Sequence, residues 1–312
     1  MSPIPLLNPQ RGAALLTVLL LVAMATTIVS FMAQQQGFWQ REMVNSRDRA
    51  QASYIAQAGV DWARAVLADD RSNNTNNPYD HAREMWAVKL PAIPVDGGEV
   101  QGSIEDQQGL FNLNNLVKNG VTSLPDVVRL QRLLSILGLP QELAYALADW
   151  IDADATPAAS GGAEDGYYLN LVVPYRAGNV WVNEVSELLW VRGFDASTLQ
   201  RLQGFVTVLP ARTQLNVNFA TAEVLVAVVD GLSLQQARAL VSRRKEQPFK
   251  SVDEFYEQLP KGVGESSRGE MTVSSEFFLV DGHATLAQGE FVAQALLQRN
   301  TMWASVVRQS VQ

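Results

Sequence analysis

The chain has 312 residues, of which 47% are hydrophobic and 18% charged, so it is long enough to bury a sizeable core. Its net charge of −8 argues against attraction of the whole surface to nucleic acid or anionic lipid. It contains no cysteine and only two histidines, His81 and His283, which excludes disulfides, zinc–thiolate sites, cysteine nucleophiles and a three-histidine metal site.

The N-terminal part of the chain predicts a membrane-spanning helix. No residue from Ala13 to Ala33 is charged, and the run is long enough to cross a hydrocarbon core of about 30 Å. The apolar region of a cleaved signal peptide is shorter, roughly 7 to 15 residues, and ends at a small-residue cleavage site. Apolar residues continue at helical spacing from Tyr54 to Val66. The pattern therefore predicts one helix of about 50 residues.

A short leader, "MSPIPLLNPQRG", precedes this helix and ends in Arg11-Gly12. It resembles the type IV prepilin leader, which a prepilin peptidase cuts after that glycine while the hydrophobic helix is kept. The resemblance implies cleavage between Gly12 and Ala13, with methylation of the new N-terminus. An ordinary membrane anchor followed by a helical stalk is the alternative that the residues alone leave open.

The fifth position of such a mature chain is Thr17. Most pilin-like proteins carry Glu there, and a carboxylate in hydrocarbon is costly unless it is paired. In such filaments its partner is the N-terminal amine of a neighbouring subunit, which a subunit at the filament tip does not have. Among the pseudopilins of type II secretion, the large K-type minor subunit lacks this Glu, and the chain resembles that subunit.

Beyond the long helix, the sequence changes character twice. The polar segment Asp69–Pro78 is predicted to end the helix as a loop. Residues Val100–Ile104 alternate as a strand does, and Asp106–Gly109 indicates a turn. From Leu116 to about Gly264 the pattern is almost entirely one of short helices.

Strand-favouring residues return near the C-terminus, with turn signals at Asp281-Gly282 and Gln288-Gly289. Strand material on both sides of a helical block predicts an α+β fold. We expect a type IV pilin-like long N-terminal helix and a small antiparallel sheet, with a large all-α domain inserted. The predicted parts are a leader at 1–12, a transmembrane pilin helix at 13–68, a pilin-like domain at 69–112 and 266–312, and the inserted helical domain at 113–265.

Within the helical block a weak repeat pairs two helices around a glycine turn, at Gly138, Gly193 and Gly231. The third copy resembles a helix-hairpin-helix module of the kind that binds DNA, in which backbone amides and basic side chains hold phosphates. Its basic residues are Arg238, Arg243, Arg244, Lys245 and Lys250. Nearby acidic residues offset this charge, so a solvated helix face is the simpler interpretation. Charge reversal at Arg243, Arg244 and Lys245, tested at low salt, separates the two.

An acidic segment is the second candidate site. Asp149, Asp152 and Asp154 are followed by Glu164 and Asp165 after a loop rich in Gly and Ala. Carboxylates this dense repel one another unless a cation lies among them, and hard oxygen ligands suit calcium. The spacing is not that of an EF-hand. An exposed acidic loop and a glycosidase-like carboxylate pair are the alternatives, although nothing nearby marks a sugar cleft.

Other polar residues near this segment are further candidates as ligands, namely Asn170, Asn179 and Glu184. The motifs "DWIDAD", "GAEDGYY", "PYR" and "NVNFATAEVL" are similar to those of the K-type pseudopilins. The helical insertion of that family is similar to insertions that bind calcium, which strengthens the prediction of a structural calcium ion. Trp150, Tyr167 and Tyr168 are expected to belong to the core.

The resemblance covers nearly the whole chain and implies a non-enzymatic role. We expect a minor pseudopilin that starts and caps the pseudopilus, in the bacterial inner membrane by a single span, with most of the chain in the periplasm. The implied partners are I-like and J-like minor pseudopilins, the major pseudopilin, the prepilin peptidase and secreted substrates, with no nucleic acid. The alternative is a membrane-anchored helix-hairpin-helix protein of the DNA-uptake type.

Overall fold

The structure, a computed structural model, describes residues 10–73, 78–95, 98–158, 161–286 and 289–311. Its helices are α1 Gln10–Asn73, α2 Leu124–Ile136, α3 Leu143–Ile151, α4 Asp165–Tyr168, α5 Ala196–Leu202, α6 Ala222–Val228, α7 Leu234–Glu246 and α8 Val252–Glu257, with short 3-10 helices η1 Met85–Ala87, η2 Leu113–Leu116, η3 Val185–Trp190 and η4 Glu265–Glu270. Its strands are β1 Leu90–Val95, β2 Gly98–Asp106, β3 Phe111–Asn112, β4 Val117–Lys118, β5 Val121–Thr122, β6 Val206–Thr207, β7 Leu215–Asn216, β8 Met271–Thr272, β9 Phe277–Leu286, β10 Gly289–Gln298 and β11 Ser305–Val311.

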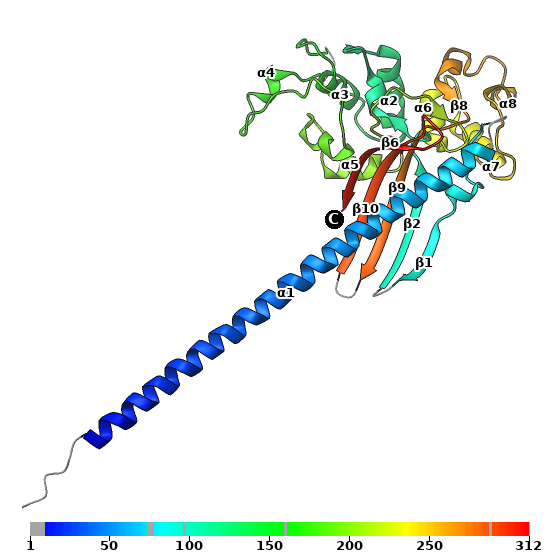
Figure 1. Cartoon of the computed structure of the whole chain (residues 1–312). Coiled ribbons are helices and arrows are strands. Elements are labelled where there is room, and N and C mark those ends of the chain that lie inside the picture. Colours follow the sequence, from blue (N-terminus) through cyan, green and yellow to red (C-terminus); the bar gives the residue numbers. More distant parts are fainter. Residues whose placement is uncertain (1–9, 74–77, 96–97, 159–160, 287–288, 312) are drawn as a thin grey trace, which may run out of the picture.

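The long helix α1 has 64 residues and projects far beyond the rest of the molecule (Figure 1). It ends at Asn73, so the first residues of the polar segment that was predicted as a loop are helical. Polar side chains satisfy their hydrogen bonds within this last turn, because Asn73 Nδ2 donates to Asp69 Oδ2 and Ser72 Oγ donates to the Asp69 carbonyl. Polar composition alone therefore did not end the helix.

The upper half of α1 covers one face of a five-stranded antiparallel sheet with the strand order β1-β2-β9-β10-β11 (Figure 1). Val60, Ala63 and Leu67 recur at i, i+3 and i+7, which places them on one side of the helix. They are buried against Phe278 and Leu297 of the sheet. This apolar contact holds the helix on the sheet, while the apolar residues of the lower half stay exposed.

The helical part of the chain is inserted between two neighbouring strands. β2 pairs with β9 over its whole length, from Gly98 opposite Leu286 to Asp106 opposite Phe278. The elements between them, β3 to β8, form a separate hydrophobic core at one end of the sheet (Figure 1). The predicted α+β class, with a pilin-like helix and sheet and a helical insertion, is thereby confirmed.

Two kinds of glycine explain where the turn predictions succeeded and failed. The repeat glycines Gly138, Gly193 and Gly231 all have positive φ, at 65°, 82° and 79°, and each connects two helical segments as predicted. The predicted turn at Asp281-Gly282 is wrong, because β9 runs straight through it. Gly282 lies opposite Gly102, where a Cβ would approach the Asp281 carbonyl to 3.0 Å, so these glycines permit close strand approach.

The other strand predictions fared better. The strand expected at Val100–Ile104 is confirmed as the middle of β2. The turn expected at Asp106–Gly109 is present, since the Gly109 amide donates to the Asp106 carboxylate. β9 and β10 pair from Leu286 and Gly289 onwards, and residues 287–288, which include half of the second predicted turn signal, lie outside the described residues.

A buried ion network joins α1, the sheet and the helical part. The guanidinium of Arg299, after β10, lies 2.7 Å from an oxygen of Asp70 near the end of α1 and 2.6 Å from one of Asp80. It also donates to the Ser275 carbonyl and lies over the Phe278 ring. Asp80 in turn accepts from the Ser275 amide, so one arginine connects segments more than 200 residues apart in the chain.

We expect Arg299→Met to lower the free energy of unfolding by about 3 to 5 kcal/mol, because it leaves the buried Asp80 carboxylate without its cation. Thermal unfolding of the full chain in detergent measures this. Arg308→Met, which removes an exposed arginine from β11, is the matched control. An equal decrease in both variants would contradict the assignment.

A second prediction concerns pH. Burial raises the pKa of Asp106 to about 7, outweighing its hydrogen bonds with Ser275 and the Gly109 amide. Between the ordinary pKa of an aspartate and about 7, the folded chain binds more protons than the unfolded chain, so stability falls as pH rises through this window. We expect Asp106→Asn to reduce the loss of melting temperature between pH 5 and pH 8. Asp253→Asn, at an exposed carboxylate, should leave the loss unchanged.

Candidate functional site

Three carboxylates of the helical part converge on one point. Asp152 and Asp154, just after α3, and Glu164, just before α4, each offer an oxygen, and these oxygens lie within 4.8 Å of one another. Asp152 and Glu164 are buried, whereas Asp154 is exposed. This cluster of carboxylates, here called the acidic centre, is made from the loop after α3 and the residue before α4.

Local structure fixes Asp152 and Asp154 in place. Asp152 is the residue at which α3 ends, with an extended backbone, and its Oδ2 accepts from Thr122 Oγ1 at 2.6 Å. The Ala153 amide is bound by the Gly120 carbonyl, so the β4–β5 hairpin supports this loop. Asp154 Oδ1 accepts from the Thr156 amide at 2.7 Å. Each aspartate therefore accepts a hydrogen bond within the protein on one carboxylate oxygen, and its other oxygen remains available to a ligand.

Glu164 is the most telling member of the acidic centre. Both of its carboxylate oxygens are buried without a hydrogen-bond partner, and so is Oδ1 of Asp152. Burial, followed by repulsion from Asp149, Asp152 and Asp154, raises the pKa of Glu164 to about 7. Buried carboxylate oxygens without donors are costly, and a cation would satisfy them. The donor set is all oxygen, which fits a hard divalent cation such as calcium.

Two of the five predicted ligands have other partners. Asp149, which is buried, accepts from the Ala158 amide at 2.9 Å and packs against Gly162, where a Cβ would lie 2.1 Å from its Oδ2. Asp165 accepts from the Ala177 amide and forms an ion pair of 3.5 Å with Arg176. These two carboxylates shape the loops on either side of the acidic centre, while the other three meet in it.

The additional candidates take part in loop structure. Asn170 Nδ2 donates to the Gly166 carbonyl, Asn179 has a φ of 46°, and Glu184 caps η3 with its side chain. Of the aromatic residues expected in the core, Trp150 and Tyr168 are buried. Tyr167 is 38% exposed, and the Arg192 guanidinium lies over its ring.

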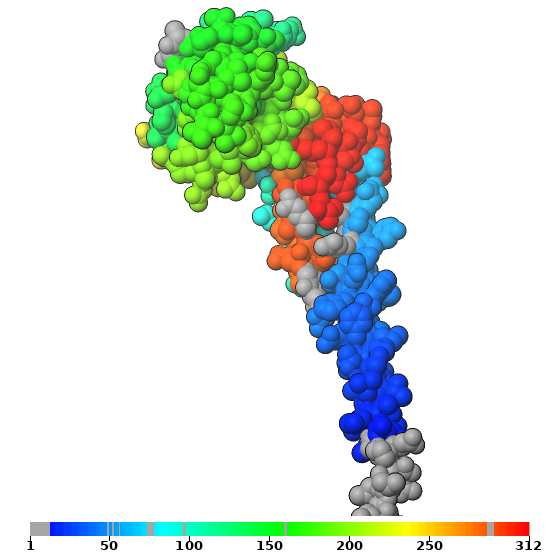
Figure 2. Space-filling model, turned by 90° about the vertical axis from the view of Figure 1, so that its left-hand side faces the viewer, coloured from blue at the N-terminus to red at the C-terminus, as the bar shows by residue number. Residues whose placement is uncertain are grey.

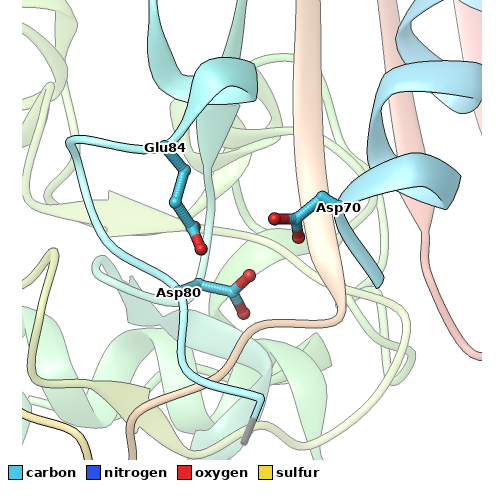
Figure 3. Close-up of side chains that lie close together, drawn as sticks. All are labelled: Asp70, Asp80 and Glu84. Atoms are coloured by element: carbon cyan, nitrogen blue, oxygen red, sulfur yellow. The ribbon is translucent and has the colours of Figure 1, made fainter. Parts of the chain in front are cut away.

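Sequence reasoning missed a second group of carboxylates, Asp70, Asp80 and Glu84. Figure 3 shows these side chains directed toward a common point, and one oxygen of each lies within 4.8 Å of the others. The guanidinium of Arg299 already supplies a cation to Asp70 and Asp80. Burial raises the pKa of Glu84 to about 7, and its Oε2 accepts from the His81 amide and from Trp86 Nε1. No sequence pattern links these residues to Arg299, so only the fold reveals the network.

The N-terminal part of α1 has the length and composition of a membrane-spanning segment. By length and composition, α1 from Ala13 onward includes a stretch able to cross a membrane, and none of that stretch is buried against the rest of the chain. Gly12 and Ala13 belong to the first turns of α1, and residues 1–9 of the predicted leader lie outside the described residues. Thr17 Oγ1 donates to the Ala14 carbonyl at 2.9 Å, so its polar group is satisfied within its own helix.

Several side chains in the basic cluster of the third repeat already bind partners within the protein. Arg244 is half-buried and donates to the Val217 carbonyl, and burial lowers its pKa to about 10. The Arg243 guanidinium bonds Gln258, and Arg238 lies 4.0 Å from Glu223. These contacts favour a structural role for the cluster over phosphate binding.

Comparison with known proteins gives a consistent result. Two family models, both described as "Type II secretion system (T2SS), protein K", match residues 109–211 and 215–270. The chain is 36% identical to type II secretion system protein K of Pseudomonas aeruginosa, over 93% of this chain and 89% of that protein. It is 32% identical to the protein K of Klebsiella pneumoniae, over 96% and 95% of the two chains.

A solved structure is similar as well. It is the GspK-GspI-GspJ complex of the type 2 secretion system of enterotoxigenic Escherichia coli. The matched chain is 26% identical, with a TM-score of 0.76, and the match covers 87% of this chain and 99% of that one. The similarity therefore includes the sheet and the helical insertion together.

Proposed function

The chain belongs to the type II secretion system protein K family and is a minor pseudopilin of that system, and we propose that it starts the pseudopilus and occupies its tip. The observation that supports this position is the bulk of the helical part, which lies at the opposite end of the molecule from the start of α1 (Figure 2). It is far wider than the helix and sheet below it. Stacking a further subunit above such a part would leave no path for that subunit's own helix.

Thr17 supports the same position. If the mature chain begins at Ala13, Thr17 occupies the place where a carboxylate would need the N-terminal amine of the next subunit. The Thr17 hydroxyl bonds within its own helix instead, so it makes no such demand. A subunit at the tip, with no neighbour above it, meets this condition.

We propose I-like and J-like minor pseudopilins as the direct partners, since the similar solved structure contains GspI and GspJ beside GspK. The major pseudopilin would continue the filament below, and secreted substrates would meet the exposed helical part. The apolar start of α1 fits a membrane anchor, and we place it in the inner membrane with the remainder in the periplasm. The role proposed is structural, without catalysis.

We further propose that the acidic centre binds calcium. The support is the unpartnered oxygens of Glu164 and Asp152 beside Asp154. These three would be the side-chain ligands, while Asp149 and Asp165 shape the loops. The ion would supply positive charge that neutralises the repulsion and fixes the loop after α3 to the start of α4. Its role would be structural.

Processing of the leader is the first prediction of this proposal. We expect the protein from its native membrane to lack residues 1–12 and to begin at Ala13, because the prepilin peptidase cuts after Gly12. Intact mass, measured with and without an active peptidase, tests this. An uncut chain in the presence of active peptidase would count against the pilin-like class and leave α1 as an ordinary anchor.

For the calcium site, we expect the effect of one substitution on the melting temperature to depend on whether calcium is present. Binding stabilises the folded chain, by about 2.7 kcal/mol at a concentration 100 times the Kd, so chelation should lower the melting temperature. Glu164→Gln should abolish this response. In chelator, however, the variant should melt above the unsubstituted chain, because it removes a buried, repelled carboxylate.

The exposed carboxylate Glu257, in α8, provides the control. Glu257→Gln should keep the full calcium response, since it lies outside the acidic centre. If the unsubstituted chain has the same melting temperature in calcium and in chelator, the proposed site is contradicted.

A further inference from the structure

The two edges of the five-stranded sheet are built differently. β1, at one edge, contains Pro91 and Pro94, which have no amide hydrogen to donate to another strand. Its register with β2 is also irregular between Leu90 and Ile93. Prolines on an edge strand protect that edge from pairing.

β11, at the other edge, lacks such prolines, although its register with β10 also shifts once, between Leu296 and Leu297. Its seven residues, "SVVRQSV", contain no proline, and all seven are exposed. The only charged residue is Arg308, whose guanidinium is held by the Asn183 carbonyl of the helical part. In the part of the chain that the structure describes, no strand other than β10 pairs with β11.

The ladder fixes which backbone groups of β11 point outward. The Arg299 amide donates to the Glu276 carbonyl at 2.6 Å, so odd-numbered residues of β10 bond to β9 and even-numbered ones to β11. Gln294 and Leu296 therefore bond to Ser310 and Arg308, which lie opposite them. The amide and carbonyl groups of the residues between, above all Gln309, are directed away from the sheet.

The surroundings of this edge are apolar and firmly held. Met302 and Trp303, in the loop before β11, are 57% and 45% exposed, and Val306 is 38% exposed. Arg64 of α1 donates to the Ala304 carbonyl at 2.7 Å and its guanidinium lies over the Trp303 ring. This open edge is thus attached to α1 and stands at the molecular surface beside it, as the red region of Figure 2 shows.

The opposite face of β11 borders a groove. A groove of about 340 Å³ runs between β11 and η3, lined by Glu184, Val185, Ser186, Leu296 and Ser310 among others. Side chains of an added strand alternate between two faces. One set would lie in this groove, and the other would lie near Val306 and Trp303.

We propose that β11 pairs through its backbone with an edge strand of a neighbouring pilin-like subunit, which extends the sheet across the subunit boundary. This inference rests on the proposed function, because the neighbour is a subunit whose own helix lies beside α1 in the membrane. Such a subunit rises along α1 and meets β11 near Arg64. The edge at β1 is closed, so pairing occurs on one side only, as suits a chain at the end of an assembly.

Hydrogen exchange of the full chain in detergent, alone and with purified I-like and J-like subunits, tests this. We expect the β11 amides that point outward, such as that of Gln309, to exchange fast in the free chain and slowly in the complex. A complex that forms without this protection overturns strand pairing and leaves the proposed function intact. Failure to form any complex counts against the proposed function itself. Protection in the free chain that grows with its concentration would assign the edge to a second copy, and so overturn the partner named here.

Substitutions at Gln309 give an independent test. Gln309→Pro removes the outward amide hydrogen, and we expect it to weaken the complex by about tenfold. Gln309→Ala keeps that hydrogen and should bind as before. Equal binding by Gln309→Pro and Gln309→Ala would refute the pairing.

A thiol test covers the case in which the proline variant fails to fold. The chain has no cysteine, so Gln309→Cys introduces a single thiol. Paired strands hold it opposite alternate residues of the partner strand, and disulfides should form with cysteines at every second partner position. Cross-links without this alternation would contradict strand pairing.

Discussion

The guanidinium of Arg299 is the point on which the arrangement of the parts depends. It binds Asp70 at the end of α1, Asp80 in the following segment and the Ser275 carbonyl before β9. Charges this deeply buried are stable only when their partners are all in place, so the network tolerates few alternative geometries. The direction of the helical part relative to α1 is thereby fixed by electrostatics, in addition to the apolar packing of Val60, Ala63 and Leu67.

The acidic centre and the Arg299 network both bring three carboxylates together, and they differ in the source of the positive charge that balances them. Both gather three carboxylates within 4.8 Å, and both contain a Glu with its pKa raised to about 7 by burial. At Arg299 the cation is part of the chain. At the acidic centre no arginine or lysine reaches the unpartnered oxygens of Glu164 in the described residues, and this is why we propose a cation from outside the chain there. That contrast is the physical basis for assigning a metal ion to one cluster and none to the other.

How far the sequence predicted this structure depends on the range of the interaction involved. Local signals served well: the apolar helix, the strand at Val100–Ile104 and the turn glycines Gly138, Gly193 and Gly231 all follow from neighbours in the chain. The turn predicted at Asp281-Gly282 is wrong because a Gly that lets two strands approach has the same local sequence pattern as a Gly in a turn. The separation of the five predicted ligands into three that meet and two that brace the loops depends on hydrogen bonds from Ala158 and Ala177, which no spacing encodes.

Three features far apart in the sequence point to the same asymmetry. If the mature chain begins at Ala13, Thr17 makes no demand on a subunit above; the helical part would obstruct stacking at the far end of α1; and Pro91 and Pro94 close one edge of the sheet. A subunit inside a regular filament needs two complementary surfaces, because each copy must bind the copies before and after it. On the proposed function, a chain closed on one side in these three ways would join the assembly only at its end. Its position at the tip would then be a property of the fold, independent of the order in which the subunits meet.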